Sequence, residues 1–212
     1  MKVRILKVAI WLAALAPLAW CVAGYFEDWL GANPIEKLEH VTGMTTLLTL
    51  LATLAVTPLR RLTGWNPLIN VRRPLGLFAF FYAFLHFGVW AGLDQTLVWS
   101  WMKDDIVKRP YITVGFTGFV LLIPLALTST KGWIRRLGKK WTTLHRLIYV
   151  TAALGVIHYY WSVKADVRIP VLLGIIYLGL MAMRVPGWIQ KRRRRKARDY
   201  PSRLALSPAA RR

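Results

Sequence analysis

Two histidines, His86 and His158, lie inside long uncharged segments of the chain and are its best-placed chemical groups. An imidazole in hydrocarbon is costly unless a partner satisfies it, so a histidine at such a position is a functional candidate. At a rise of about 1.5 Å per residue, His86 lies about 10 Å before Leu93 and His158 about 8 Å before Val163, where their segments end. Two neutral imidazoles from neighbouring helices are the axial pair that a low-spin heme iron binds. The matched depths therefore predict a heme iron held between the two segments.

Aromatic residues are dense around both histidines, and they supply flat apolar surface suited to a porphyrin. Those near His86 are Phe78, Phe81, Tyr82, Phe84, Phe87 and Trp90. Those beside His158 are Tyr159, Tyr160 and Trp161. Structural hydrogen bonding is the alternative role for a histidine in a membrane segment.

A third histidine, His145, precedes His158 by 13 residues, which corresponds to a rise of about 20 Å along one helix. The residue 13 positions before His86 is Arg73, whose guanidinium stays protonated and does not ligate iron. Three roles therefore stay open for His145. It is a single ligand to a second heme, a contact to a quinone or flavin, or an interfacial histidine.

Other polar residues near the segment ends are candidates for secondary contacts. His40 precedes the second segment, where water reaches it, so its role is a contact to a heme propionate, an alternative ligand or a surface residue. Arg72, Arg73 and Arg146 suit propionates or a cofactor phosphate, because guanidinium groups pair with such anions through two hydrogen bonds. Their alternative role is to anchor the topology.

The elements that carry these residues are predicted to be membrane helices. The chain has 212 residues, of which 56% are hydrophobic, and it holds 30 Lys and Arg against 9 Asp and Glu. A span needs roughly 20 apolar residues. Six uncharged runs meet or approach that length: Val8–Phe26, Val41–Leu59, Pro74–Leu93, Pro110–Thr130, Leu147–Val163 and Ile169–Met183. We therefore expect an all-α integral membrane protein with six transmembrane helices in one bundle.

Charge at the segment ends predicts the orientation, because basic residues are retained on the cytoplasmic side. Basic residues precede the first run and follow the second, fourth and sixth, whereas most acidic residues lie at the opposite ends. Both termini are therefore expected in the cytoplasm. Residues 1–190 form the predicted heme domain, and residues 191–212 a basic, disordered cytoplasmic tail that contacts anionic lipid. Nucleic acid is not an expected partner, since topology already accounts for the charge.

Several kinds of redox site are excluded by composition and motifs. A single cysteine, Cys21, rules out an internal disulfide and a four-cysteine iron–sulfur cluster. No G-x-G-x-x-G after a strand pattern and no Walker motif occurs, so no nucleotide-binding domain is recognisable. Electrons must therefore come from another molecule. No internal repeat is evident.

The motifs around these histidines resemble one family. They are Arg72-Arg73-Pro74-Leu75-Gly76-Leu77, Leu85-His86, Arg109-Pro110-Tyr111-Ile112-Thr113, Leu137-Gly138-Lys139-Lys140-Trp141, Leu144-His145-Arg146-Leu147-Ile148-Tyr149 and Ile157-His158-Tyr159-Tyr160-Trp161-Ser162-Val163-Lys164. Together they resemble the MsrQ (also called YedZ) family, whose members are the heme-binding membrane subunits of bacterial methionine sulfoxide reductase systems. This family belongs to the ferric-reductase-like transmembrane superfamily. The likeness spans nearly the whole chain.

The resemblance implies a multi-pass protein of the bacterial inner membrane that binds heme b, one or two per chain, and passes electrons outward. Its acceptor would be MsrP, a periplasmic molybdopterin enzyme that reduces methionine sulfoxide in oxidised proteins. The donor would be a cytosolic flavin reductase using NADH, or the quinone pool, and FMN is associated with the family. The essential histidines of the family map onto His86, His145 and His158. Arg73 stands where larger relatives have a fourth histidine.

Two other functions remain as alternatives to an electron-transfer subunit without its own catalytic residues. One is a ferric or quinone reductase that acts directly at one membrane face. The other is a small transporter in which the histidines relay protons, and it predicts a colourless protein. Absorbance of the purified chain separates the transporter from the two redox functions.

Overall fold

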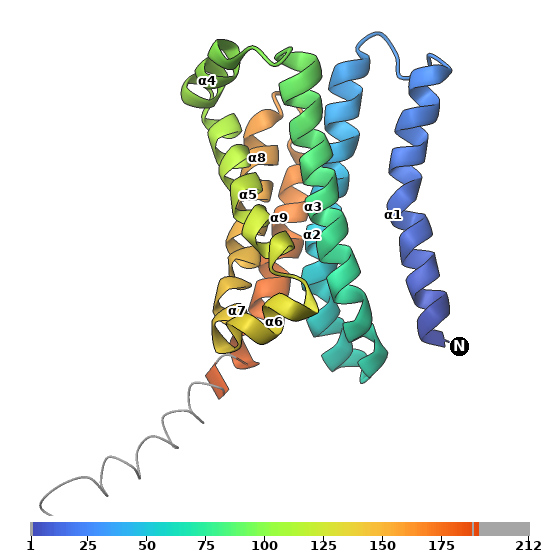
Figure 1. Cartoon of the computed structure of the whole chain (residues 1–212), viewed down its shortest axis with the longest axis vertical. Coiled ribbons are helices and arrows are strands. Elements are labelled where there is room, and N and C mark those ends of the chain that lie inside the picture. The colour runs from blue at the N-terminus through green and yellow to red at the C-terminus, as the bar shows by residue number, and fades with distance from the viewer. Residues whose placement is uncertain (1, 188, 191–212) are drawn as a thin grey trace, which may run out of the picture. The chain divides into compact units, whose positions relative to one another are not determined.

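The computed structural model describes residues 2–187 and 189–190, and every regular element within them is a helix (Figure 1). The elements are α1 Lys2–Phe26, α2 Pro34–Thr63, η1 Asn66–Val71, α3 Arg72–Gly88, η2 Val89–Asp94, α4 Trp99–Lys108, α5 Pro110–Leu127, α6 Lys131–Leu137, α7 Lys139–Leu144, α8 Leu147–Ser162 and α9 Arg168–Ala182. The element η1 is a 3₁₀ helix and η2 is a π-helix. The all-α prediction is confirmed, while the tail predicted over 191–212 lies outside the described residues.

Five helical stretches of the described chain are long and apolar enough to cross a membrane. They are Arg4–Phe26, Pro34–Thr63, Asn66–Asp94, Pro110–Leu127 and Arg168–Gly187. The predicted span Leu147–Val163 forms α8, which has 16 residues and is shorter than the roughly 20 residues of a straight span. Helix length therefore supports five of the six predicted spans.

Two boundaries differ from those expected, each for a local reason. Helix α2 begins at Pro34, earlier than the predicted Val41, because the Asn33 side chain caps it by accepting a hydrogen bond from the Glu36 amide at 3.2 Å. Helix α4 was not predicted, because its charged residues are typical of a loop. One of them, Lys108, pairs with Asp104 one helical turn earlier at 2.6 Å, which supports the helix.

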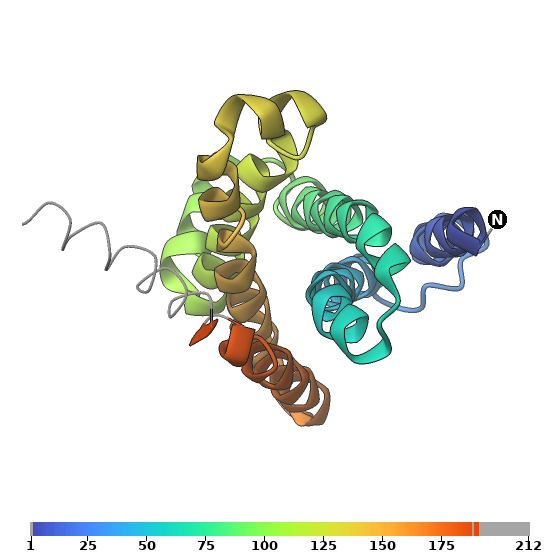
Figure 2. The same ribbon diagram turned by 90° about the horizontal axis from the view of Figure 1, so that it is seen from below.

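Four helices close a ring within the compact unit of residues Met1–Tyr177; a second unit begins at Leu178, inside α9. Helix α2 packs on α3, α3 on α5, α5 on α8 and α8 on α2 (Figure 2). The side chains of Leu54, Ala79 and Ala152 in this ring are fully inaccessible to solvent. The ring is the frame that positions both central histidines, which lie on α3 and α8.

Helix α1 attaches to the ring through the phenol of Tyr82, which is fully buried on α3. The Tyr82 hydroxyl accepts a hydrogen bond from the Leu18 amide at 3.2 Å and donates one to the Ala14 carbonyl. In an uninterrupted helix that amide would donate directly to that carbonyl. The hydroxyl therefore bridges two backbone groups of α1 that lie one helical turn apart, next to Pro17.

Replacing Tyr82 with phenylalanine is expected to loosen α1, because the substitution removes both hydrogen bonds that join the Tyr82 hydroxyl to the α1 backbone. The expected loss in the free energy of unfolding is about 1–3 kcal/mol. Thermal unfolding in detergent micelles measures it, and Tyr160→Phe, at a phenol on the exposed side of α8, serves as the control. Equal unfolding temperatures for both variants would contradict the role given to the Tyr82 hydroxyl.

Candidate functional site

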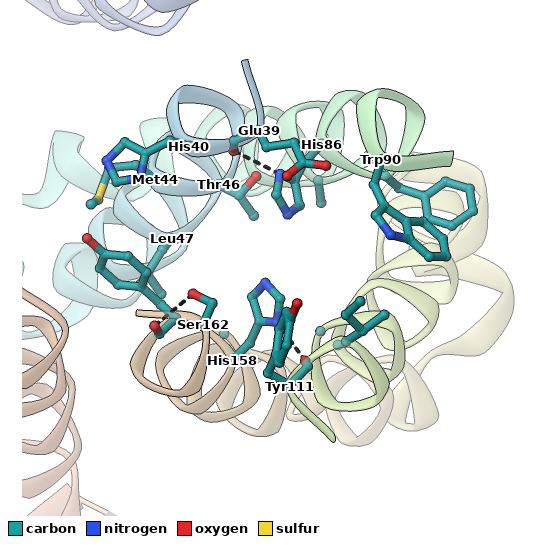
Figure 3. A pocket seen from close by; sticks show the side chains of 18 of the residues that line it. Glu39, His40, Met44, Thr46, Leu47, His86, Trp90, Tyr111, His158 and Ser162 are labelled. Atoms are coloured by element: carbon teal, nitrogen blue, oxygen red, sulfur yellow. Dashed lines mark hydrogen bonds between the residues drawn. The ribbon is translucent and has the colours of Figure 1, made fainter. Parts of the chain in front are cut away.

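A cavity of about 830 Å³ lies inside the ring of α2, α3, α5 and α8 (Figure 3). Its volume falls within the range of about 300–1,000 Å³ that is usual for small-molecule and cofactor sites. One wall is aromatic: Phe87 stacks on Phe119, with ring centroids 4.8 Å apart and planes 13° from parallel. Phe116 and Trp90 extend that wall. The cavity thus offers a flat apolar surface.

His86 and His158 face one another across this cavity (Figure 3). Their ring centroids are 6.1 Å apart, and the ring planes are inclined by 73°. His86 comes from α3 and His158 from α8, so two helices on opposite sides of the cavity each contribute one ring. The structure therefore brings together the two residues that the sequence singled out by depth.

Each imidazole is held from behind by a backbone carbonyl of the neighbouring helix. Nδ1 of His86 lies 3.0 Å from the carbonyl oxygen of Glu39, and Nδ1 of His158 lies 2.7 Å from that of Tyr111. A carbonyl oxygen only accepts hydrogen bonds, so Nδ1 carries the proton in both rings. The lone pair of each neutral ring is then on Nε2, which is the arrangement that a metal-binding histidine needs.

The separation of the two rings matches that of two axial ligands on one iron. Each imidazole–metal bond is about 2 Å long, so a shared metal ion holds the two nitrogens about 4 Å apart. Each ring centre lies about 1 Å beyond its nitrogen, so the expected distance between centroids is about 6 Å. The observed 6.1 Å fits this value without movement of either helix.

Two buried polar atoms that line the cavity have no hydrogen-bond partner among the described residues. They are Nε1 of Trp90, a donor, and Oε1 of Glu39, an acceptor. Trp90 belongs to the π-helical turn η2 that follows α3, and such turns are frequent at functional sites. Orphaned polar atoms in a cavity are consistent with a ligand that carries polar groups beside its apolar part.

The structure places His145 away from this pair, between α7 and α8, and it does not line the cavity. Its ring stacks on Trp141 with centroids 4.0 Å apart, and its Nε2 lies 3.0 Å from the hydroxyl of Thr128. Trp141 donates its own indole hydrogen bond to the Thr128 carbonyl. Burial, and then the nearby charge of Arg72, lower the pKa of His145, so its neutral form is favoured at pH 7.

The remaining candidates lie at the edges of the site or outside it. His40 is exposed at the edge of the cavity, with its ring centroid 6.2 Å from that of Tyr159 (Figure 3). Arg73 and Arg146 are exposed near the start of α3 and α8, and neither lines the cavity. Of the aromatic residues expected around His86, only Phe87 and Trp90 line the cavity; the rings of Phe78 and Tyr82 pack against α1 instead.

Sequence reasoning missed the residues that hold the imidazoles, although a signal for them exists. The two histidine–carbonyl hydrogen bonds each span 47 residues of sequence. The first set consists of the Glu39 carbonyl, Gly43 and His86. The second set, the Tyr111 carbonyl, Gly115 and His158, follows in the same order, each member 72 residues after its counterpart. The helix pairs α2–α3 and α5–α8 therefore present a carbonyl, a glycine and a histidine to one another with the same spacing.

Comparison with known proteins agrees with this arrangement. A family model described as ferric reductase like transmembrane component matches residues 41–156. The protein-methionine-sulfoxide reductase heme-binding subunit MsrQ of Herminiimonas arsenicoxydans is 50% identical over 199 residues, covering 92% of this chain and 91% of that protein. The subunit of the same name from Xanthomonas campestris pv. campestris (strain 8004) is 47% identical over 210 residues, covering 96% and 94%. No solved structure matches the chain.

The matched region, residues 41–156, contains most of α2, all of α3 and α5 and most of α8, which are the four helices of the ring. The alignment with each relative extends over nearly the full length of this chain and of that relative, so it includes the elements outside the ring as well. On this evidence the chain belongs to the MsrQ family and carries its ferric-reductase-like transmembrane domain.

Proposed function

We propose that this protein is a membrane cytochrome that carries electrons from the cytoplasmic side of the bacterial inner membrane to a periplasmic methionine sulfoxide reductase. The observation that carries the proposal is the pair His86 and His158, whose ring centroids lie 6.1 Å apart across a cavity with an aromatic wall. The printed name of the relatives, a heme-binding subunit of such a reductase, supports it. The chain acts as an electron-transfer subunit, and the reduction of methionine sulfoxide takes place on its partner.

The cofactor is heme b, and Nε2 of His86 and Nε2 of His158 are the atoms that would hold its iron. When bound, the iron supplies a one-electron couple between its ferric and ferrous states. The carbonyls of Glu39 and Tyr111 fix the orientation of the two ligands and raise their basicity through the Nδ1 hydrogen bonds. The Trp90 indole, which has no hydrogen-bond partner among the described residues, is suited to donate a hydrogen bond to a polar group of the cofactor.

The topology consists of six spans with both termini in the cytoplasm. Arg60 and Arg61 at the end of α2 and Lys131 at the start of α6 lie at one end of the helices, with Glu36 and Asp94 at the other. Positive charge is retained in the cytoplasm, so the first end faces inward. On this topology the short helix α8 is the fifth span, and the paired histidines lie toward the periplasmic end of the ring.

Electrons enter at the cytoplasmic end, where His145 lies between Thr128 and Trp141. The donor is a cytosolic flavin reductase or the quinone pool, and the site accepts either FMN, a quinone or a second heme through His145. Arg73 and Arg146, the exposed guanidinium groups of this region, are suited to bind anionic groups of such a cofactor. The acceptor at the periplasmic end is the molybdopterin enzyme MsrP.

Electron transfer across a sealed membrane tests this function. We expect vesicles that contain the purified chain, with a reductant outside and an impermeant oxidant inside, to reduce that oxidant about tenfold faster than empty vesicles, a barrier difference of about 1.4 kcal/mol. MsrP and methionine sulfoxide, placed inside the vesicles instead of the artificial oxidant, should accept the electrons in its place. A heme-loaded chain that reduces ferric iron or quinone but never MsrP would favour the direct-reductase alternative.

A further inference from the structure

We infer that Gly43 and Gly115 are positioning residues: the missing side chain at each lets a histidine ligand hydrogen-bond to a helix carbonyl, and this bond sets the electronic character of the ligand. The inference rests on the proposed heme ligation by His86 and His158. It assigns a role to two residues that contribute no polar side-chain group of their own.

Helix geometry explains why a glycine is needed at these positions. In an α-helix the carbonyl of residue i already accepts the amide of residue i+4, so Glu39 pairs with Gly43 and Tyr111 with Gly115. A side chain at i+4 leans toward the helix N-terminus and covers that carbonyl. At Glu39 and Tyr111 the imidazole Nδ1 approaches the carbonyl on the side where a Cβ atom of residue i+4 would lie, so a glycine there leaves room for the ring.

The space at Gly115 shows how closely the His158 ring approaches the backbone of α5. A Cβ atom added there would lie 2.5 Å from Nδ1 and 2.8 Å from Cε1 of His158. Real Cβ atoms essentially never approach so closely, so the ring would have to leave the Tyr111 carbonyl.

Gly43 lies against the His86 ring as Gly115 lies against the His158 ring, but at longer distances. A Cβ atom there would lie 3.1 Å from Cε1 and 3.2 Å from Nδ1 of His86. The Nδ1 of His86 has a longer bond to its carbonyl, 3.0 Å, and a second neighbour in the Thr42 hydroxyl at 3.3 Å. The His86 ring would therefore have to shift by only a few tenths of an ångström, less than the His158 ring beside Gly115. The two glycines should differ in strength of effect but not in its direction.

The electronic consequence follows from the role of the Nδ1 hydrogen bond. A ligating imidazole that donates its Nδ1 proton to a carbonyl is more basic, and a more basic ligand stabilises the ferric over the ferrous state. Losing the bond at His158 should therefore weaken heme binding and raise the midpoint potential of any heme that remains. A residue that only filled space in the ring would not shift the potential in one direction.

The test compares Gly115→Ala, Gly43→Ala and Gly118→Ala in the full-length chain, purified in detergent. Gly118 is the matched control, because it lies on the same helix and also lines the cavity, yet an added Cβ there meets no histidine and only ordinary contacts, the nearest at 3.6 Å. The readouts are heme per polypeptide, midpoint potential from a spectroscopic redox titration, and elution as a single species. Loss of an outer-shell partner typically costs about 10- to 100-fold in affinity, so Gly115→Ala should lower heme retention by about tenfold.

Four results decide the inference. Lowered retention or a positive shift in potential for Gly115→Ala, with Gly118→Ala unchanged, supports it, and Gly43→Ala should shift the potential less but with the same sign. Wild-type retention and potential in Gly115→Ala overturn it. If Gly115→Ala does not elute as a single species, the potential of Gly43→Ala decides in the same way. A parent chain that binds no heme overturns the proposed function, whereas a heme-loaded parent with indifferent glycines overturns only this inference.

Discussion

His158→Ala and His86→Ala are each expected to lower the heme content of the purified chain by about tenfold or more, since loss of an outer-shell partner alone costs about 10- to 100-fold. Each substitution removes one of two imidazoles whose Nε2 atoms face the same cavity. The remaining histidine leaves the iron five-coordinate, so residual heme should become high-spin. Heme quantitation per polypeptide and the ferric absorption spectrum measure both effects. Added imidazole should restore part of the low-spin spectrum by entering the cavity left by the missing side chain.

Two other histidines are the controls for this prediction. His40→Ala changes an exposed ring at the cavity edge, and His145→Ala changes a ring outside the cavity. Both should retain the heme that is bound between His86 and His158. Heme content that falls equally in all four variants would mean that the pair has no special part in holding the iron.

Narrowing the cavity without touching a ligand is expected to exclude heme almost as strongly. Ala83 and Gly155 line the cavity, and each lies three residues before a histidine on the same helix face. A leucine at either position occupies the space beside the iron ligands that a flat macrocycle needs. Overpacking of this kind costs about 1–3 kcal/mol, which corresponds to about tenfold to a hundredfold less bound heme. Heme titration of the detergent-solubilised variants measures the loss.

The matched control for the narrowed cavity is Gly88→Leu. Gly88 lies on α3, two residues after His86, and nothing lies within 4 Å of a Cβ added there. It does not line the cavity, so its variant should bind heme like the parent chain. If Ala83→Leu and Gly155→Leu also bind heme like the parent, the cavity described here is not where the cofactor is held.

The fold was largely predictable because the length of a membrane helix and its lack of charged residues can be read from the sequence. Five of the six predicted runs appear as helical stretches that satisfy both criteria. The errors arose where local chemistry overrides hydropathy: the Asn33 cap extends α2 toward the N-terminus, and an ion pair one helical turn apart supports α4. A cap and an ion pair add no apolar residue, so a search for apolar runs does not detect them.

The sequence pointed to the two facing histidines of the candidate site but not to the groups that hold them. Counting residues along helices placed His86 and His158 at similar depth, and the structure places their rings opposite one another with centroids 6.1 Å apart. The same count said nothing about rotation, so it wrongly grouped Phe78 and Tyr82 with the cavity, whereas both pack against α1. The carbonyls of Glu39 and Tyr111 were undetectable from side-chain identity, because every residue has such a group. The glycine four residues after each carbonyl was the readable sign.

Low-temperature electron paramagnetic resonance of the oxidised, unmutated chain tests most directly whether one iron is bound by His86 and His158. Two axial imidazoles make the ferric iron low-spin, and ring planes inclined by 73° predict a strongly anisotropic signal with one large g value. We expect that signal in the purified protein and its loss in His158→Ala. A high-spin signal from the parent chain, or a colourless protein without any heme signal, would contradict the account.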